Sequence, residues 1–214
     1  MTNPKVRMYK EQSFGHLKGL AGISDRQIAE HLALYAGYVR QVNKLNEELA
    51  ELRSRSQASA RHAEFAELTR RLGFEYNGMI LHEYYFSDLR PAPESMPRQG
   101  SKLADALTEA FGSVDQWLTA FQAIAAMRGV GWVILFQDAV TKRLSDHWIS
   151  LHQDGVPAGF KPLLVMDVWE HAFMPDYRAS ERVLYIDAFF RNVDWEMVER
   201  RLEGDIAIRP AVAA

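Results

Sequence analysis

The chain has 214 residues, of which 48% are hydrophobic, and it carries a formal net charge of -3 with no cysteine. These values suit one compact unit or two small, closely packed domains, and they exclude disulfides, thiolate metal sites and cysteine nucleophiles. The mild charge gives no support for binding to nucleic acid or a membrane surface, and no apolar run has transmembrane length. The N-terminus has no apolar signal segment, so we expect a cytoplasmic protein.

The first strong helix signal follows an irregular stretch over residues 1–22. Ser24 and Gln27 have the spacing of a capping box, and Asp25 lies in the first turn, where a carboxylate favours the helix dipole. Apolar or aromatic side chains then recur every three or four residues, at Ile28, Leu32, Tyr35, Val39, Val42, Leu45 and Leu49. His31 falls on this stripe, and Tyr38 lies two turns further along the same face.

A second helix is predicted from Phe74 to Leu89. It is apolar nearly all round, which predicts a buried helix, and it contains Gly78 and His82. The charged segment before it, residues 43–71, is predicted to form the solvent-exposed arm of a helical hairpin. The proline-rich segment that follows, PAPESMPRQG, is the best domain boundary in the chain.

The second half of the chain mixes helices and strands. Helices are predicted at 102–111, 114–127, 181–191 and 195–202, and strands at 129–138, 143–152 and 162–169. The predicted fold is therefore α+β: an N-terminal helical hairpin domain (1–92) and a C-terminal α/β domain (93–214) with a three-stranded antiparallel sheet.

The third predicted strand, PLLVMDVW, delivers Asp167 and, four residues later, His171. A carboxylate and an imidazole at the end of a buried strand are costly to desolvate unless something pairs with them. A metal ion would do so, and an ordinary Asp–His hydrogen bond is the alternative. Since His31 and His82 also lie in apolar contexts, the set of three histidines and one aspartate suits Mn, Fe or Zn. The other histidines, His16, His62, His147 and His152, sit in polar or mixed surroundings and receive no role.

Several segments resemble the iron/manganese superoxide dismutases, in the order that this family has them. DVWEHAF is similar to the metal-binding signature of the family. ISDRQIAEHLALYAGYVRQVNKL is similar to its first helix, HEYYFSDLRP to the segment with the second histidine, GVGWVILF to its glycine–tryptophan strand, and NVDWEMVERRL to its closing helix.

The resemblance implies a site between the two domains, in which His31, His82, Asp167 and His171 bind one Mn or Fe ion with a solvent molecule as fifth ligand. It implies disproportionation of superoxide to O2 and H2O2 by one-electron cycling of that ion. It also implies a homodimer, in which Glu170 contacts the partner subunit.

The resemblance further implies residues around the metal. Tyr38 would be the gateway tyrosine, Trp132 and Trp169 would form the aromatic wall, and Gln153 would reach the solvent ligand from the sheet domain. Gly78 together with Gln153 slightly favours Mn over Fe, although Val165 fits neither metal type.

The departures from the family pattern lie at the substrate gateway. Seven residues separate His31 from Tyr38 where the family has eight, which predicts a regular helix in place of a π-bulge. The gateway histidine has no counterpart, with Leu34 and Tyr35 as candidates, and its partner tyrosine is Met174 here. The pattern favours a dismutase with a changed entrance. The alternative is a diverged metal-binding member of the family with a storage, other redox or partner-binding role.

Overall fold

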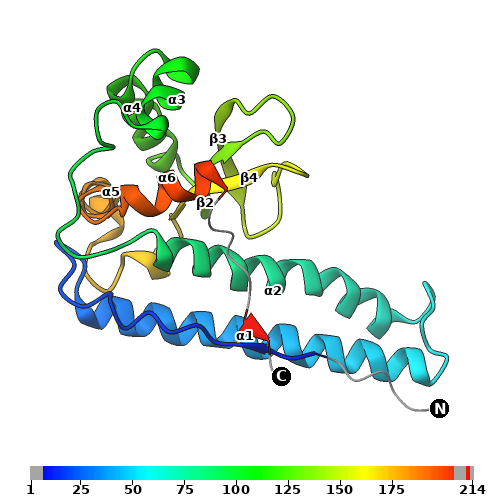
Figure 1. Cartoon of the computed structure of the whole chain (residues 1–214). Helices are drawn as coiled ribbons and strands as arrows, with labels where there is room; N and C mark the ends of the chain where they lie inside the picture. The colour runs from blue at the N-terminus through cyan, green and yellow to red at the C-terminus, as the bar shows by residue number, and fades with distance from the viewer. Residues whose placement is uncertain (1–6, 205–210, 213–214) are drawn as a thin grey trace.

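The computed structural model describes residues 7–204 and 211–212 (Figure 1). Its α-helices are α1 (Asp25–Ser54), α2 (Ala63–Ser87), α3 (Lys102–Phe111), α4 (Val114–Ala125), α5 (Arg182–Phe190) and α6 (Trp195–Glu203). Its strands are β1 (Tyr9–Lys10), β2 (Gly131–Gln137), β3 (Leu144–Ser150), β4 (Lys161–Asp167) and β5 (Ala211–Val212). Two short 3-10 helices are η1 (Glu170–Ala172) and η2 (Ala179–Glu181). Within the described residues, no helix combines the length and apolarity needed to cross a bilayer.

The two longest helices, α1 and α2, lie side by side as an antiparallel hairpin (Figure 1). The predicted start of α1 is confirmed, because the hydroxyl of Ser24 caps the helix by accepting from Gln27 N at 3.0 Å. The helix runs to Ser54 as a regular α-helix, as the shortened spacing predicts. The second helix begins earlier than predicted, at Ala63, because the charged segment before Phe74 is rich in residues that favour helix.

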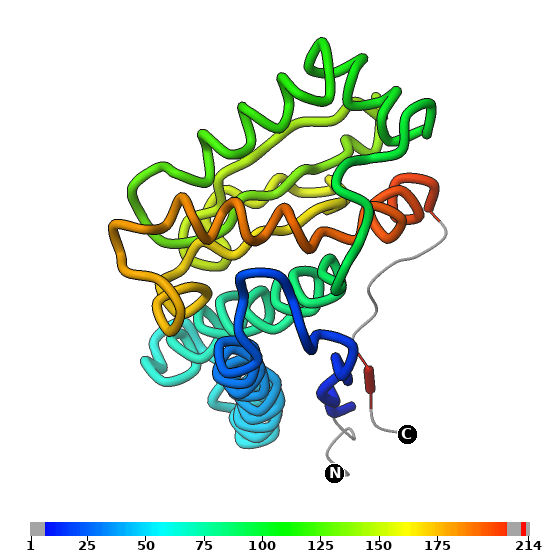
Figure 2. Tube along the Cα trace, turned by 90° about the vertical axis from the view of Figure 1, so that its left-hand side faces the viewer, coloured from blue at the N-terminus to red at the C-terminus, as the bar shows by residue number. Residues whose placement is uncertain are grey.

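The predicted three-stranded antiparallel sheet is confirmed, with the order β3-β2-β4. The central strand β2 is buried along its whole length, and its register places Trp132 opposite Asp167. Figure 2 shows α3 and α4 over one side of the sheet and the hairpin on the other. Strand β4 packs against α2, and its last residue, Asp167, lies beside His31 and His82 of the hairpin.

A buried ion pair fastens the end of α2 to β4. The carboxylate of Asp88 pairs with the guanidinium of Arg201 on α6, and both side chains are at most 1% exposed. Asp88 Oδ2 also accepts from Val165 N at 2.8 Å, while Arg201 Nη1 donates to Leu163 O at 2.8 Å. The pair thus fixes β4 relative to α2 two residues before Asp167. The division into domains 1–92 and 93–214, which falls in the linker after α2, stays a prediction.

A second, two-stranded sheet joins segments from opposite ends of the sequence. Tyr9 of β1 pairs with Val212 of β5, and Lys10 pairs with Ala211. The side chain of Asn43 on α1 anchors this sheet, since it accepts from Tyr9 N at 2.7 Å and donates to Tyr9 O at 2.9 Å. The stretch over residues 1–22, predicted to be irregular, contains β1, and its residues 1–6 lie outside the described residues.

Candidate metal centre

Four side chains from separate elements converge beside the end of β4. His31 comes from α1, His82 from α2, Asp167 from the end of β4 and His171 from η1. Asp167 Oδ2 lies 3.2 Å from His31 Nε2, 3.7 Å from His82 Nε2 and 3.1 Å from His171 Nε2. The structure therefore brings together all four residues predicted to form a metal site.

The separations within this cluster are close to those of ligands on one ion. Nitrogen and carboxylate ligands lie about 2.0–2.2 Å from a first-row metal, so two of them are separated by at most roughly 4.4 Å. The distances from Asp167 Oδ2 to the three imidazoles lie inside this limit, and all four ligand atoms lie within 4.8 Å of one another. His82 Nδ1 lies 2.5 Å from the carbonyl of Gly78, which only accepts, so Nδ1 carries the proton. The lone pair of His82 is then on Nε2, which is buried and has no hydrogen-bond partner. A cation at the centre of the cluster would bind that lone pair.

The protonation states of the cluster also suit a cation. Burial lowers the pKa of His31 and lowers that of His82 further, so both are neutral near pH 7, the form that binds a metal. Burial alone would raise the pKa of Asp167, but interactions with His171 and His31 outweigh it and lower the pKa. Asp167 is therefore an ionised carboxylate, of a type that pairs well with a first-row metal.

Three further hydrogen bonds hold the ligand backbone and side chains in position. Asp167 Oδ1 accepts from Trp169 N at 2.8 Å, which leaves Oδ2 for the cluster, and Asp167 O accepts from the hydroxyl of Tyr185 at 2.8 Å. The buried amide of Gln27 on α1 donates to His171 O at 2.7 Å. The spacing of Ser24 and Gln27 predicts a capping box, but Ser24 N donates to Asp176 Oδ2 at 2.7 Å and the Gln27 side chain instead ties α1 to η1.

The residues next to the cluster form a hydrogen-bonded chain from Trp132 through His152 to Tyr38. The indole N–H of Trp132 only donates, so His152 Nδ1 accepts it, at 3.0 Å. Burial lowers the pKa of His152 to about 4, so the ring is neutral near pH 7 and its proton is on Nε2. His152 Nε2 lies 2.7 Å from the hydroxyl oxygen of Tyr38 and donates to it. The hydroxyl proton of Tyr38 is thereby left free for a different acceptor.

Gln153 does not occupy the position that the resemblance implies, and this is a correction. Gln153 is exposed, whereas the preceding residue, His152, is fully buried beside Tyr38. The cause is local: Leu151, which follows β3, has a positive φ of 53°, and this turn directs His152 inwards. The sequence signal was the pair His152–Gln153, because either side chain can donate and accept hydrogen bonds.

Two predicted aromatic residues lie against the ligands. The ring of Trp132 meets His82 edge-to-face at a centroid distance of 5.0 Å. Trp169 stacks between His152 and His171, at centroid distances of 5.0 and 5.7 Å. Both rings thus pack against predicted ligands, and their role as an aromatic wall stays a prediction.

Gly78 makes room for Tyr38. A Cβ atom at position 78 would lie 2.5 Å from Tyr38 Cδ1, far inside van der Waals contact. The Tyr38 ring uses this space to reach His82, at a centroid distance of 5.2 Å. Tyr38 thus stays beside the cluster in spite of the shortened spacing from His31.

The remaining gateway candidates lie elsewhere. Tyr35 is buried in the hairpin, where its hydroxyl donates to Glu83 Oε1 at 2.8 Å, and it therefore does not replace the gateway histidine. Leu34 is partly exposed. Glu170 is exposed and Met174 is 50% exposed, so both are available at the surface next to His171.

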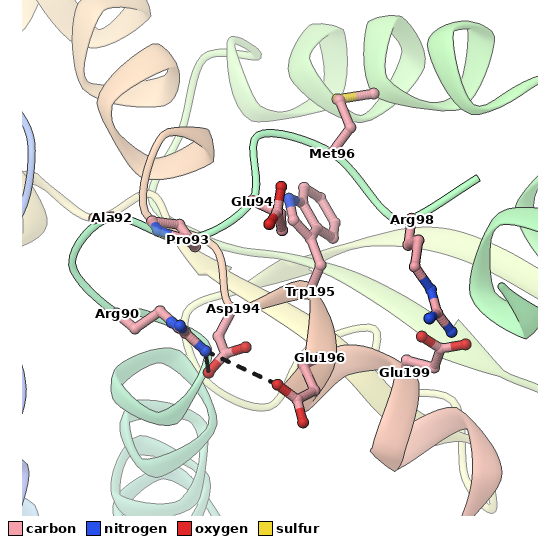
Figure 3. A pocket seen from close by; sticks show the side chains of 10 residues that line it. All are labelled: Arg90, Ala92, Pro93, Glu94, Met96, Arg98, Asp194, Trp195, Glu196 and Glu199. Atoms are coloured by element: carbon pink, nitrogen blue, oxygen red, sulfur yellow. Dashed lines mark ion pairs between the residues drawn. The ribbon is translucent and has the colours of Figure 1, made fainter.

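A separate cleft of about 390 Å³ lies between the segment that follows α2 and the start of α6 (Figure 3). None of its lining residues belongs to the cluster, and its charged side chains are largely engaged with one another or with the backbone. Arg90 pairs with Asp194 at 3.7 Å and with Glu196 at 4.0 Å, and Glu199 Oε1 accepts from Lys102 N at 3.0 Å. These contacts fasten the linker to α6, and the metal chemistry belongs to the cluster.

The fold and the cluster together have the form of a mononuclear metal protein, in which a helical hairpin and a sheet share one site. The family model for the C-terminal domain of iron/manganese superoxide dismutases matches residues 98–201. An Fe superoxide dismutase of Aquifex pyrophilus is 37% identical over 201 residues, covering 92% of each chain. A Mn superoxide dismutase of Halobacterium salinarum is 34% identical over 173 residues, covering 81% of this chain and 82% of the relative. A Mn/Fe superoxide dismutase of Aeropyrum pernix is 33% identical over 135 residues, covering 63% of each. The chain belongs to the iron/manganese superoxide dismutase family.

Proposed function

We propose that the chain is a superoxide dismutase, an oxidoreductase that uses one Mn or Fe ion held by His31, His82, Asp167 and His171. The observation that carries the proposal is the convergence of three imidazoles and one carboxylate, with the unpartnered Nε2 of His82 among them. When bound, the ion supplies one-electron oxidation of one superoxide to O2 and one-electron reduction of a second to H2O2.

The second half of the reaction consumes two protons, and Tyr38 is placed to supply one. Burial is the main cause that raises the pKa of Tyr38, so the phenol keeps its proton near pH 7. His152 donates to the Tyr38 oxygen, and so the Tyr38 O–H is free to donate to a substrate or solvent oxygen. His152 takes the role that the resemblance implied for Gln153, and Trp132 fixes its tautomer.

The features described at this site favour neither Mn nor Fe. The preference for Mn depended on Gly78 together with Gln153, and Gln153 faces solvent. Gly78 is required by the Tyr38 ring whichever metal is present. The relatives include enzymes named for Fe, for Mn and for both.

A homodimer that covers the His171 side of the site is part of the proposal. The side chain of His171 is 26% exposed, unlike the other three ligands, which are fully buried. Met174, Val183 and Leu184, which follow it in the chain, are each at least 50% exposed. Exposed apolar side chains beside a half-open ligand support a subunit interface, with Glu170 as a contact to the partner's site. A cytoplasmic location and an antioxidant role stay predictions.

The test is dismutation by protein loaded separately with Mn and with Fe, compared with the variants His171→Ala and His147→Ala. The second variant is a matched control, because His147 lies on β3, outside the cluster. We expect turnover with at least one metal, with loss of metal and turnover in His171→Ala and neither loss in His147→Ala. Stoichiometric metal in the unaltered chain without turnover would overturn the dismutase assignment. It would favour the diverged, non-dismutase alternative.

A further inference from the structure

A positively charged side chain lies next to the Tyr38–His152 pair, on the neighbouring helix. The ring of Phe74 on α2 packs against His152 at a centroid distance of 4.5 Å and lies 6.3 Å from the ring of Tyr38. The guanidinium carbon of Arg71 lies over the ring of Phe74, 4.8 Å from its centroid. Arg71, Phe74 and His152 thus form a continuous layer that leads from the surface to Tyr38.

A carboxylate on the same helix restrains the position of the Arg71 guanidinium. Arg71 Nε donates to Glu75 Oε1 at 2.7 Å, one helical turn further along α2. The side chain of Arg71 is 55% exposed, whereas that of Glu75 is only 5% exposed. An anion that approaches from solvent therefore meets the guanidinium before the carboxylate. The two contacts, to Glu75 and to Phe74, restrict a side chain that would otherwise be free to move.

Two basic side chains that follow Tyr38 on α1 pair with carboxylates outside the layer formed by Arg71, Phe74 and His152. Arg40 pairs with Glu11 at 3.8 Å, and Lys44 pairs with Glu48 at 3.8 Å on the exposed side of α1. The exposed guanidinium of Arg71 contributes positive potential beside Tyr38, and the more deeply placed carboxylate of Glu75 reduces that potential.

We propose that Arg71, held by Glu75 and Phe74, is the steering residue that guides anionic substrate past Tyr38 towards the metal centre. This inference rests on the proposed function, because superoxide is the anion to be guided. Arg71 touches no reacting atom and acts only through its electrostatic field, which raises the local anion concentration and the association rate.

The test measures kcat/KM for superoxide at low and at high ionic strength in three variants of the loaded enzyme. Arg71→Gln removes the charge, and Glu75→Gln removes the opposing carboxylate while keeping an oxygen that accepts from Arg71. Arg70→Gln is the matched control, because Arg70 is adjacent, exposed and paired with Glu67 at 3.4 Å. Arg70 and its partner Glu67 do not belong to the layer formed by Arg71, Phe74 and His152.

We expect kcat/KM at low ionic strength to fall about two- to fivefold in Arg71→Gln and to rise by a similar factor in Glu75→Gln. Arg70→Gln should match the unaltered enzyme, and added salt should bring all four proteins together. A loss in both Arg71→Gln and Glu75→Gln that persists at high salt would show a merely structural role and overturn the proposal. Equal rates in all proteins at low salt would overturn it too.

A second measurement separates this inference from the dismutase assignment. Azide is a small anion that binds a loaded ferric or manganic site and changes its visible spectrum. Its dissociation constant at low salt should rise about two- to fivefold in Arg71→Gln, even in a protein without superoxide turnover. An unchanged azide affinity in a turning-over enzyme would sink the steering role while leaving the dismutase function in place.

Discussion

Two buried carboxylates, Asp88 and Asp167, both lie where α2 meets β4, and both are fully buried. Asp88 faces the guanidinium of Arg201, so the chain itself supplies the neutralising cation. Asp167 faces three imidazoles, of which burial keeps two neutral, and the chain supplies no fixed cation there. Since both carboxylates are equally buried, the charge of the neighbouring side chains distinguishes a structural ion pair from a site that can bind a metal.

The largest expected effect comes from removing the metal, because only the Asp167 site depends on it. At a free ion concentration 1,000-fold above Kd, binding stabilises the native state by about 4 kcal/mol. For a chain of this size, stripping the ion should lower Tm by roughly 8–16 °C. Calorimetry of loaded and chelated protein measures this shift. An identical Tm in both would mean that the cluster binds no ion.

Breaking the Asp88–Arg201 pair should lower the free energy of unfolding by a similar amount and should leave metal binding unchanged. Arg201→Met leaves Asp88 without its cation. Because burial already raises the pKa of Asp88 to about 7, the carboxyl must either stay charged or bind a proton, and we expect the free energy of unfolding to fall by about 3–5 kcal/mol. The double variant Asp88→Asn with Arg201→Met removes both charges and should recover most of that loss. Denaturant unfolding measures both. If the double variant were as unstable as the single one, charge balance would not be the cause.

A smaller effect is expected beside the metal ligands, from Gly78→Ala. The added Cβ would overlap the Tyr38 ring, so we expect a loss of about 1–3 kcal/mol in stability and a displaced Tyr38 with reduced turnover. Gly73→Ala is the matched control in the same helix, because a Cβ there meets nothing within 4 Å. That variant should be neutral or slightly stabilising. Equal turnover in the two variants would contradict the role assigned to Tyr38 packing.

An effect that depends on pH concerns Asp146, a partly buried carboxylate that faces neither an arginine nor the cluster. It accepts one hydrogen bond, from the indole of Trp117 at 3.1 Å, and burial raises its pKa to about 7. Because the folded pKa exceeds the unfolded value, the folded state holds the proton more tightly. Stability should therefore fall as the pH rises from about 4 to about 7.

Asp146→Asn keeps an acceptor for Trp117 and removes this pH dependence. We expect the variant to be more stable than the unaltered chain by about 2 kcal/mol at pH 8, with little difference at pH 4. Unfolding curves at the two pH values measure the gap. A gap of the same size at both would show that Asp146 does not titrate in this range.

The four metal ligands could be predicted from sequence because each lies in a segment with strong local patterning. His31 and His82 fall on apolar helix faces, Asp167 ends a buried strand and His171 follows it, so local structure alone directs the first three into the core and His171 to its edge. The boundaries of α3 and the three-stranded sheet were predictable for the same reason. Helical and strand periodicities act over a few residues, and they need no knowledge of distant contacts.

The rest of the site depends on contacts that the sequence does not display. A single backbone angle at Leu151 decides that His152, and not Gln153, lies beside Tyr38. The Asp88–Arg201 pair joins residues that are 113 positions apart, and no local pattern relates them. The strands β1 and β5 have two residues each, too short for a periodic signal, and they exist only because the fold brings them together.

The pairing of Tyr9 with Val212 makes this small sheet a clasp between segments that are far apart in sequence. Such a contact forms only after the intervening chain has folded, because closing so large a loop carries a high entropic cost. By the same reasoning it is the easiest to release, since its few hydrogen bonds are partly exposed. Amide exchange at Tyr9 and Val212 should therefore be fast compared with that in β2. Separation of β1 from β5 would be the first stage of unfolding, and it would leave the cluster of His31, His82, Asp167 and His171 intact.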